Sequence, residues 1–209
     1  MKLRCTSFSD NQPMPASTAF GKPDAAEHMA LSDNKNPGFE WSDIPANTRS
    51  LVMICHDRDV PTVFDDVNRE GKTISADLAR MDFFHWSLVD IATNISAIKE
   101  GEFADGIVPK GKPGPEAAQG TRQGINGYGM FFAADPDMAG DYFGYDGPCP
   151  PWNDSIAHHY VFTLYATDLE TCPVSGTFGG EDVRKAIEGH ILAQASVTGV
   201  YTMNPDVAL

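Results

Sequence analysis

Apolar and β-branched residues gather in four runs along the chain, and these runs predict strands. They are SLVMICHD (residues 50–57), FFHWSLVDI (83–91), HHYVFTLYATD (158–168) and ILAQASVTGVYT (191–202). Each run has the length and the Val, Ile and aromatic content of a buried strand. One helix is predicted over residues 181–190, because Glu181 and Asp182 in its first turn suit the helix dipole. Residues 76–81 predict at most one further short turn of helix.

The segment from Gly101 to Gly147 interrupts this pattern. It contains 11 of the 19 glycines and the turn-forming stretch GKPGP, so we predict that it is mostly loop. Strands joined by long loops, with a single late helix, favour a mainly β domain. A repeating βαβ pattern is absent, which disfavours a doubly wound parallel sheet.

Polar side chains mark one end of three predicted strands. Because strand side chains alternate between faces, His158 and Tyr160 point to one side and His159 to the other. The same rule groups side chains on the two other strands: Met53, Cys55 and Asp57, with Asp59 following if the chain stays extended, and Phe83, His85, Ser87 and Val89. A lone histidine on such a face is most often a satisfied core residue, but three polar strand ends in one small domain favour a shared site.

The net charge of the chain disfavours some classes of binding partner. The chain carries 15 Lys and Arg against 29 Asp and Glu, a formal net charge of −14. A field of this sign disfavours nucleic acid and anionic membrane surfaces. The chain shows no apolar segment of signal-peptide or membrane-spanning type, so we expect a cytoplasmic protein without stable membrane insertion. The scattered cysteines are then expected to be free thiols: Cys5, Cys55, Cys149 and Cys172.

Three motifs follow one another along the chain. The first stands here as HDRDVPT, and the second is the pair His85 and Trp86 at the start of a strand. The third is Y-x-G-P-x-P-P followed by a histidine, a second residue and a tyrosine, here Tyr145, Gly147, Pro148, Pro150, Pro151, His158, His159 and Tyr160. Together these motifs resemble the phosphatidylethanolamine-binding protein family, and most closely its bacterial Raf-kinase-inhibitor-like branch. The resemblance implies one domain over residues 1–209, with insertions near 65–82 and 128–143. It also implies a central antiparallel-rich sheet packed on a smaller sheet, with few helices.

Two positions depart from the family pattern. Arg58 replaces a proline of the first motif, and His159 replaces an arginine of the third. The second change removes a permanent cation and a fork-shaped donor. Because strand parity turns His159 away from His158, we expect this change to affect the support of the loop more than ligand contact.

The family resemblance implies a small preformed pocket for an anion such as phosphate, a carboxylate or a phosphoethanolamine-like head group. The site residues that it implies are Asp57, Asp59, His85, Gly147, Pro148, Pro151, His158 and Tyr160. Carboxylates beside the histidines favour imidazolium, whose N–H groups can bind an anion. A carboxylate left without a partner would repel that anion, so at least one of them must be neutralised.

The function implied is that of a binding module without catalysis or cofactor. The branch name alone points to regulation of a kinase, and no protein partner is identified. The branch also indicates a homodimer, whose interface the two insertions would either make or block.

Two alternatives use the same residues. Two Asp and two His are acceptable ligands for Zn²⁺ or Mn²⁺, although no HExxH or comparable spacing is present. Cys149 with His158 would be the nucleophile and base of a cysteine hydrolase, but nothing in the sequence indicates an oxyanion hole.

Overall fold

A six-stranded sheet forms the centre of the molecule, which is described here as a computed structural model covering residues 1–209. Its order is β2 (Gln12–Pro13), β11 (Ile191–Tyr201), β10 (His158–Thr167), β6 (Ser50–Pro61), β7 (Arg80–Ile91) and β9 (Arg122–Gln123). All neighbours are antiparallel except β11 and β2. The four predicted strands are the four long strands of this sheet, and the mainly β fold class is confirmed.

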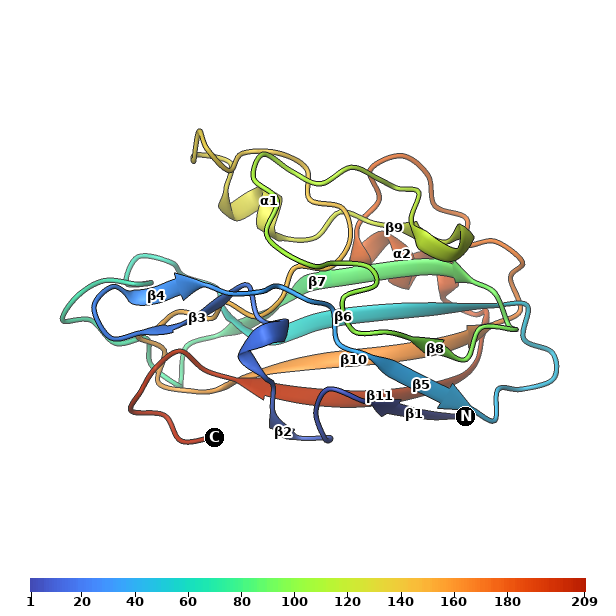
Figure 1. Cartoon of the computed structure of the whole chain (residues 1–209), viewed down its shortest axis with the longest axis horizontal. Coiled ribbons are helices and arrows are strands. Elements are labelled where there is room, and N and C mark those ends of the chain that lie inside the picture. The colour runs from blue at the N-terminus through green and yellow to red at the C-terminus, as the bar shows by residue number, and fades with distance from the viewer.

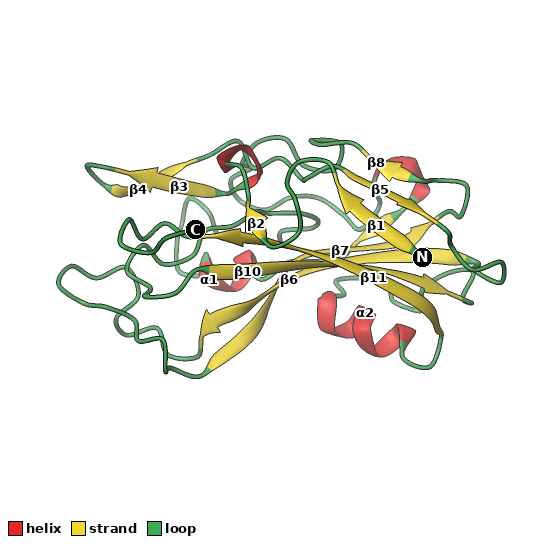
Figure 2. Ribbon diagram, turned by 90° about the horizontal axis from the view of Figure 1, so that it is seen from below, coloured by secondary structure: helices red, strands yellow, loops and turns green.

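Smaller elements cover the central sheet on both faces. A three-stranded sheet of β1 (Lys2–Cys5), β5 (Phe39–Ser42) and β8 (Ala97–Ile98) lies on one face, and helix α2 (Gly180–Ile187) lies on the other (Figure 2). The hairpin of β3 (Gly21–Asp24) and β4 (His28–Leu31) extends at one end of the molecule (Figure 1). Three short helical turns complete the fold: η1 (Ala16–Thr18), η2 (Ala118–Gly120) and α1 (Tyr128–Phe131). None of the helices has the length and apolar character that crossing a bilayer requires.

Besides a cluster of five buried residues that includes Phe83 and Tyr128, the alternation of side chains along the long strands builds two larger cores. The larger core holds 21 buried residues between the two sheets, including Trp86, Phe162 and Leu164. The smaller one holds seven, among them Val183 and Ile187, which lie one turn apart on the buried face of α2. Figure 2 shows the resulting order of small sheet, central sheet and helix.

Irregularities in the pairing of β6 and β7 correct part of the predicted parity. The register shifts between Cys55 and His56, where His85 is the extra residue, so His85 and its neighbour Trp86 face the same side. Phe83 and His85 therefore share the face on which they contact Tyr128 and Tyr160, whereas Val89 packs with the residues under α2. The prediction that Phe83, His85, Ser87 and Val89 share one face was wrong for this reason.

Two boundaries also differ from the prediction. Residues 76–81 form no helix: Leu78 donates a turn hydrogen bond to Ser75, and Arg80 already belongs to β7. Helix α2 ends at Ile187 rather than at residue 190, since Gly189 adopts a φ of 80° that breaks the helix. The segment from Gly101 to Gly147 is mostly loop, as predicted, and carries only η2, β9 and α1.

Candidate functional site

One cavity collects most of the predicted site residues. It has a volume of about 240 Å³, and 11 of its 18 lining residues are hydrophobic. The polar side chains of its floor come from the ends of three neighbouring strands: Asp57 on β6, His85 on β7, and His158 and Tyr160 on β10. Each of these four is at most 3% exposed. The three strand ends therefore meet at one cavity.

His158 is held between two carboxylates. Its Nδ1 lies 2.6 Å from Asp57 Oδ2 and its Nε2 lies 3.1 Å from Asp154 Oδ2. Ionised carboxylates only accept hydrogen bonds, so both ring nitrogens donate and the ring is an imidazolium. Burial alone would lower the pKa of His158, but Asp57 and Asp154 outweigh it and raise the pKa to about 9.

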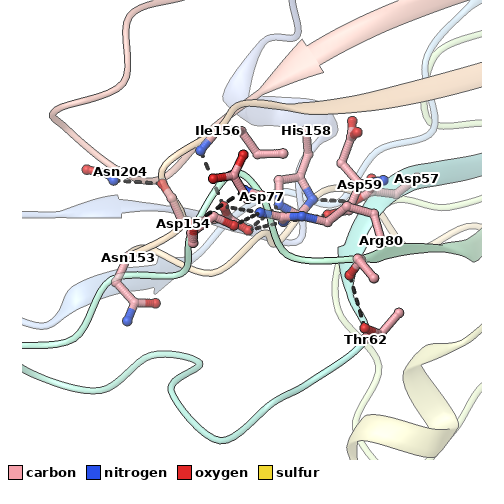
Figure 3. A network of polar contacts seen from close by, with 12 residues as sticks. Asp57, Asp59, Thr62, Asp77, Arg80, Asn153, Asp154, Ile156, His158 and Asn204 are labelled. Atoms are coloured by element: carbon pink, nitrogen blue, oxygen red, sulfur yellow. Dashed lines mark hydrogen bonds and ion pairs between the residues drawn. The ribbon is translucent and has the colours of Figure 1, made fainter.

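Arg80 completes this ion network, which is drawn in Figure 3. Its guanidinium contacts both oxygens of Asp154, at 2.6 and 3.0 Å, and also donates to the backbone carbonyl of Asp59 at 2.8 Å. Burial raises the pKa of Asp154, but His158 and Arg80 outweigh it and leave this pKa below its usual value. Two carboxylates therefore face two cations, and the network has no positive charge to spare for a ligand.

His85 is held quite differently. Its Nδ1 lies 2.7 Å from the backbone carbonyl of Asp146, which only accepts, so Nδ1 carries the proton. Burial lowers the pKa of His85, so the ring is neutral near pH 7 and Nε2 is a lone-pair acceptor. Nε2 has no hydrogen-bond partner within the protein, and the ring lines the cavity.

The hydroxyl of Tyr160 is also without a partner. The residue is 1% exposed, its Oη makes no hydrogen bond, and its ring contacts the ring of His85 at a centroid distance of 5.1 Å. A buried hydroxyl left unpaired costs about 1–3 kcal/mol. His85 and Tyr160 therefore form the part of the cavity floor whose hydrogen-bonding capacity is open.

Asp146 supports this open part from behind. Its carboxylate accepts from Asn34 and Asn126, each at 2.7 Å, and pairs with Lys112 at 2.8 Å. Its backbone carbonyl is the acceptor that orients His85. Four segments distant in sequence thus fix the tautomer and the direction of one ring.

The predicted site residues divide into two groups. Asp57, His85, Pro151, His158 and Tyr160 line the cavity, whereas Asp59, Gly147 and Pro148 do not. For the second group the structure corrects the predicted position. A β-bulge at Arg58 and Asp59 leaves Asp57 and Val60 facing the cavity and turns Asp59 away.

Asp59 instead meets His159, the residue that replaces the family arginine. Asp59 Oδ2 accepts from both the backbone N–H and Nδ1 of His159, each at 2.8 Å. His159 lies on the face opposite to His158, as strand parity predicts, and its side chain is 34% exposed. This contact fastens the bulge of β6 to β10, so His159 supports the loop and does not touch the cavity.

Gly147 and Pro148 pack the wall against the N-terminal segment. A Cβ on Gly147 would stand 2.0 Å from the Thr18 carbonyl, so its own chain, not a ligand, requires glycine here. The carbonyl of Pro148 accepts from the backbone N–H groups of Phe20 and Gly21. Both residues hold the wall from outside the cavity.

Several residues of the site escaped the sequence-based prediction. They are Arg80 and Asp154 of the ion network, Asp146 behind His85, and Tyr128, whose hydroxyl donates to the Gly147 carbonyl at 2.6 Å. Asp154 had one usable signal, since it precedes His158 by four residues within the third motif. Arg80 had none, because it lies in a segment for which a short helix was predicted.

Cys149 lines the cavity, but as a partly buried thiol. Burial raises its pKa to about 12, which is the opposite of what a nucleophilic thiolate needs. No hydrogen bond joins it to His158, whose two ring nitrogens face carboxylates. No group of three His, Cys, Asp or Glu side chains has an arrangement that could hold a metal ion.

Comparison with known proteins gives matches over almost the whole chain. The phosphatidylethanolamine-binding protein family model matches residues 5–202. A UPF0098 protein of Methanothermobacter thermautotrophicus is 27% identical over 96% of this chain and 98% of its own length. A UPF0098 protein of Aquifex aeolicus is 30% identical over 79% of this chain and 73% of its own length.

A solved structure shows the same fold. Escherichia coli YbcL, described as a new member of the mammalian PEBP family, superimposes with a TM-score of 0.67 at 22% identity. The match covers 96% of this chain and 97% of that one. The family model spans nearly the whole chain and the motifs around the cavity agree with it, so the chain belongs to the phosphatidylethanolamine-binding protein family.

Proposed function

We propose that this protein binds a small, singly charged oxyanion, a carboxylate or the monoanionic form of a phosphate monoester, on the floor of the cavity. Family membership supports a ligand-binding role, and the observation that carries the specific proposal is the unpartnered hydroxyl of Tyr160, whose ring contacts the ring of His85 on the cavity floor. A buried donor without a partner is expected to be paired by a ligand, since its free energy falls when a hydrogen bond forms.

The charge balance makes this binding dependent on a proton. Asp57 and Asp154 are already matched by His158 and Arg80, so the charge of the ligand needs a new cation. Protonation of His85 supplies it and turns Nε2 into a second donor next to Tyr160. A bound oxyanion therefore raises the pKa of His85, and binding takes up one proton above the pKa of the free protein.

The same contacts favour binding over catalysis. A general base needs a free lone pair, and both ring nitrogens of His158 are occupied by protons directed at carboxylates. The Cys149 thiol is held in its protonated form by burial. We therefore propose a binding protein, with ligand occupancy rather than chemistry as its output.

Calorimetric titration with acetate at pH 6.5, 7.5 and 8.5 tests the proposal. Acetate stays ionised across this range, so uptake of one proton predicts an affinity that falls about tenfold for each unit above the pKa of His85. Methyl phosphate in parallel distinguishes the phosphoryl head group from the carboxyl one. Tyr160→Phe should weaken binding of whichever ligand is preferred.

His85→Gln should remove the pH dependence of acetate binding. His56→Gln is the matched control. His56 lies on β6, the strand that pairs with the strand of His85, and its ring lies near Phe84 and Arg184 outside the cavity. It should leave both affinity and slope unchanged. Absence of saturable binding of either anion, or an affinity independent of pH, would refute the proposed mode.

A further inference from the structure

The mouth of the cavity has a chemistry opposite to that of its floor. Phe64, just beyond β6, and Phe131, in α1, both line the cavity, yet they are 42% and 46% exposed. Their rings meet edge to face at a centroid distance of 5.4 Å. A loop and a short helix far apart in the sequence thus place aromatic rings together at the opening, where both stay in contact with water.

Further apolar side chains connect this aromatic pair to the floor. Val67 and Met29 line the same cavity, and Phe132 packs on Phe20 and Tyr128 at centroid distances of 5.7 and 5.5 Å. The apolar lining is therefore continuous from Phe64 and Phe131 down to His85 and Tyr160. Exposed apolar groups that continue into a cavity mark a binding site more often than isolated ones do.

The volume of the cavity is larger than the volume of a head group alone. A volume of 240 Å³ corresponds to about eight water molecules at liquid density, more than a carboxylate or a single phosphate group would displace. The remaining volume is bounded by side chains that offer water few hydrogen bonds. Yet it lies below the roughly 300 Å³ at which pockets for drug-sized ligands begin, so the enclosed space favours one chain over two.

Building on the proposed function, we infer that the ligand is a single-tailed amphiphile, a monoalkyl or monoaryl carboxylate or phosphate. Phe64 and Phe131 are then the specificity-determining residues that contact its apolar part, while His85 and Tyr160 hold its head group. The tail leaves the floor along the apolar lining and passes between the two rings.

The exposed apolar residues beside the two rings offer matched controls. Val63 is 49% and Met130 72% exposed, and each precedes one of the two phenylalanines, but neither lines the cavity. If the exposed patch served only as a surface for another macromolecule, all four positions would matter alike. If it contacts the tail of a bound ligand, substitutions at Phe64 and Phe131 alone will change ligand affinity.

Affinities for the straight-chain carboxylates from acetate to octanoate test this inference. Each methylene that enters the apolar lining should improve binding about fourfold until the chain emerges from the mouth. Phe64→Ser and Phe131→Ser should flatten this dependence on chain length for the outer methylenes. Val63→Ser and Met130→Ser should leave the whole series unchanged.

A parallel series of straight-chain alcohols separates the two proposals. If acetate fails to bind but the alcohols show the same increments, and Phe131→Ser removes them, the head-group proposal fails while the inference about the mouth stands. Equal affinity for all carboxylates, or equal losses in all four serine variants, overturns the inference. A competition experiment with bound octanoate gives a further outcome that overturns the inference. In that outcome, vesicles of two-chain phosphatidylethanolamine displace octanoate at a lower lipid concentration than the matching single-chain lysolipid does.

Discussion

The two histidines on the cavity floor are buried alike, but their partners give them opposite charge states. His158 is 0% exposed and His85 is 3% exposed. His158 has a carboxylate on each ring nitrogen, which raises its pKa to about 9. His85 has a backbone carbonyl on one nitrogen and nothing on the other, and burial lowers its pKa. Burial disfavours the charged form of both rings, and only the carboxylate partners of His158 are strong enough to reverse this effect.

This difference separates structural support from ligand contact within one cavity. The region around His158 pairs both N–H groups of the imidazolium and joins β10, β6 and the Asp154 loop into one charge-balanced unit. The region around His85 and Tyr160 keeps open hydrogen-bonding capacity. A histidine that lines a pocket is therefore not by that fact a ligand contact, and the open atoms identify the binding groups better than the residue type does.

Removing Asp154 should have the largest effect on the region around His158. Asp154→Ala leaves His158 and Arg80 as buried cations with one carboxylate between them, so the free energy of unfolding should fall by about 3–5 kcal/mol. Chemical denaturation measures this. Glu170→Ala is the control, because Glu170 pairs with Arg49 at the exposed surface and should contribute little. A loss below about 1 kcal/mol for Asp154→Ala would show that the network contributes nothing net to stability.

The fold was predictable because its main signals are local. The apolar runs at residues 50–57 and 158–168 carry enough β-branched and aromatic residues to identify β6 and β10 without any distant contact. The extent of β7 was harder to predict. Its first residues, Arg80 and Met81, lack an apolar pattern and join the sheet only through pairing with Pro61 and Val60.

The site was predictable as a set of strands, but not as a set of contacts. Parity placed His158, His159 and Tyr160 correctly because β10 is regular until Ala166. It misplaced Asp59, because a bulge inserts a residue that no alternation rule anticipates. The ion pair of Arg80 with Asp154 joins residues 74 positions apart, and only the folded chain brings them together.

Raising the pH should weaken the His158 network by a smaller amount. The folded-state pKa of about 9 lies above the 6.5 of a free histidine, so the network stabilises fully below pH 6.5 and is lost as the pH rises through 9. The free energy of unfolding should fall by about 2–3 kcal/mol between pH 6.5 and 9. Urea denaturation across this range measures the change.

The source of this pH dependence can be checked with Asp154→Asn. This variant removes one of the two carboxylates that raise the pKa of His158, so the slope of stability against pH should become shallower. A wild-type stability that is flat or increases from pH 6.5 to 9 would contradict the imidazolium assignment.

The smallest effect separates two tyrosines that are equally buried, at 0% for Tyr145 and 1% for Tyr160. Tyr145 donates to the Thr18 carbonyl at 2.7 Å, whereas the Tyr160 hydroxyl has no partner. Tyr145→Phe should therefore lower the free energy of unfolding by about 1–2 kcal/mol, since it removes a made hydrogen bond and strands an acceptor. Tyr160→Phe should raise it by about 1 kcal/mol, since it removes an unpaired group. Thermal and urea unfolding of both variants without ligand measure these two changes.

Saturating ligand should stabilise wild type and Tyr145→Phe more than Tyr160→Phe, because only Tyr160 gains a partner on binding. Equal losses in both variants would mean that the Tyr160 hydroxyl is already satisfied, and the open part of the floor would then reduce to His85 alone.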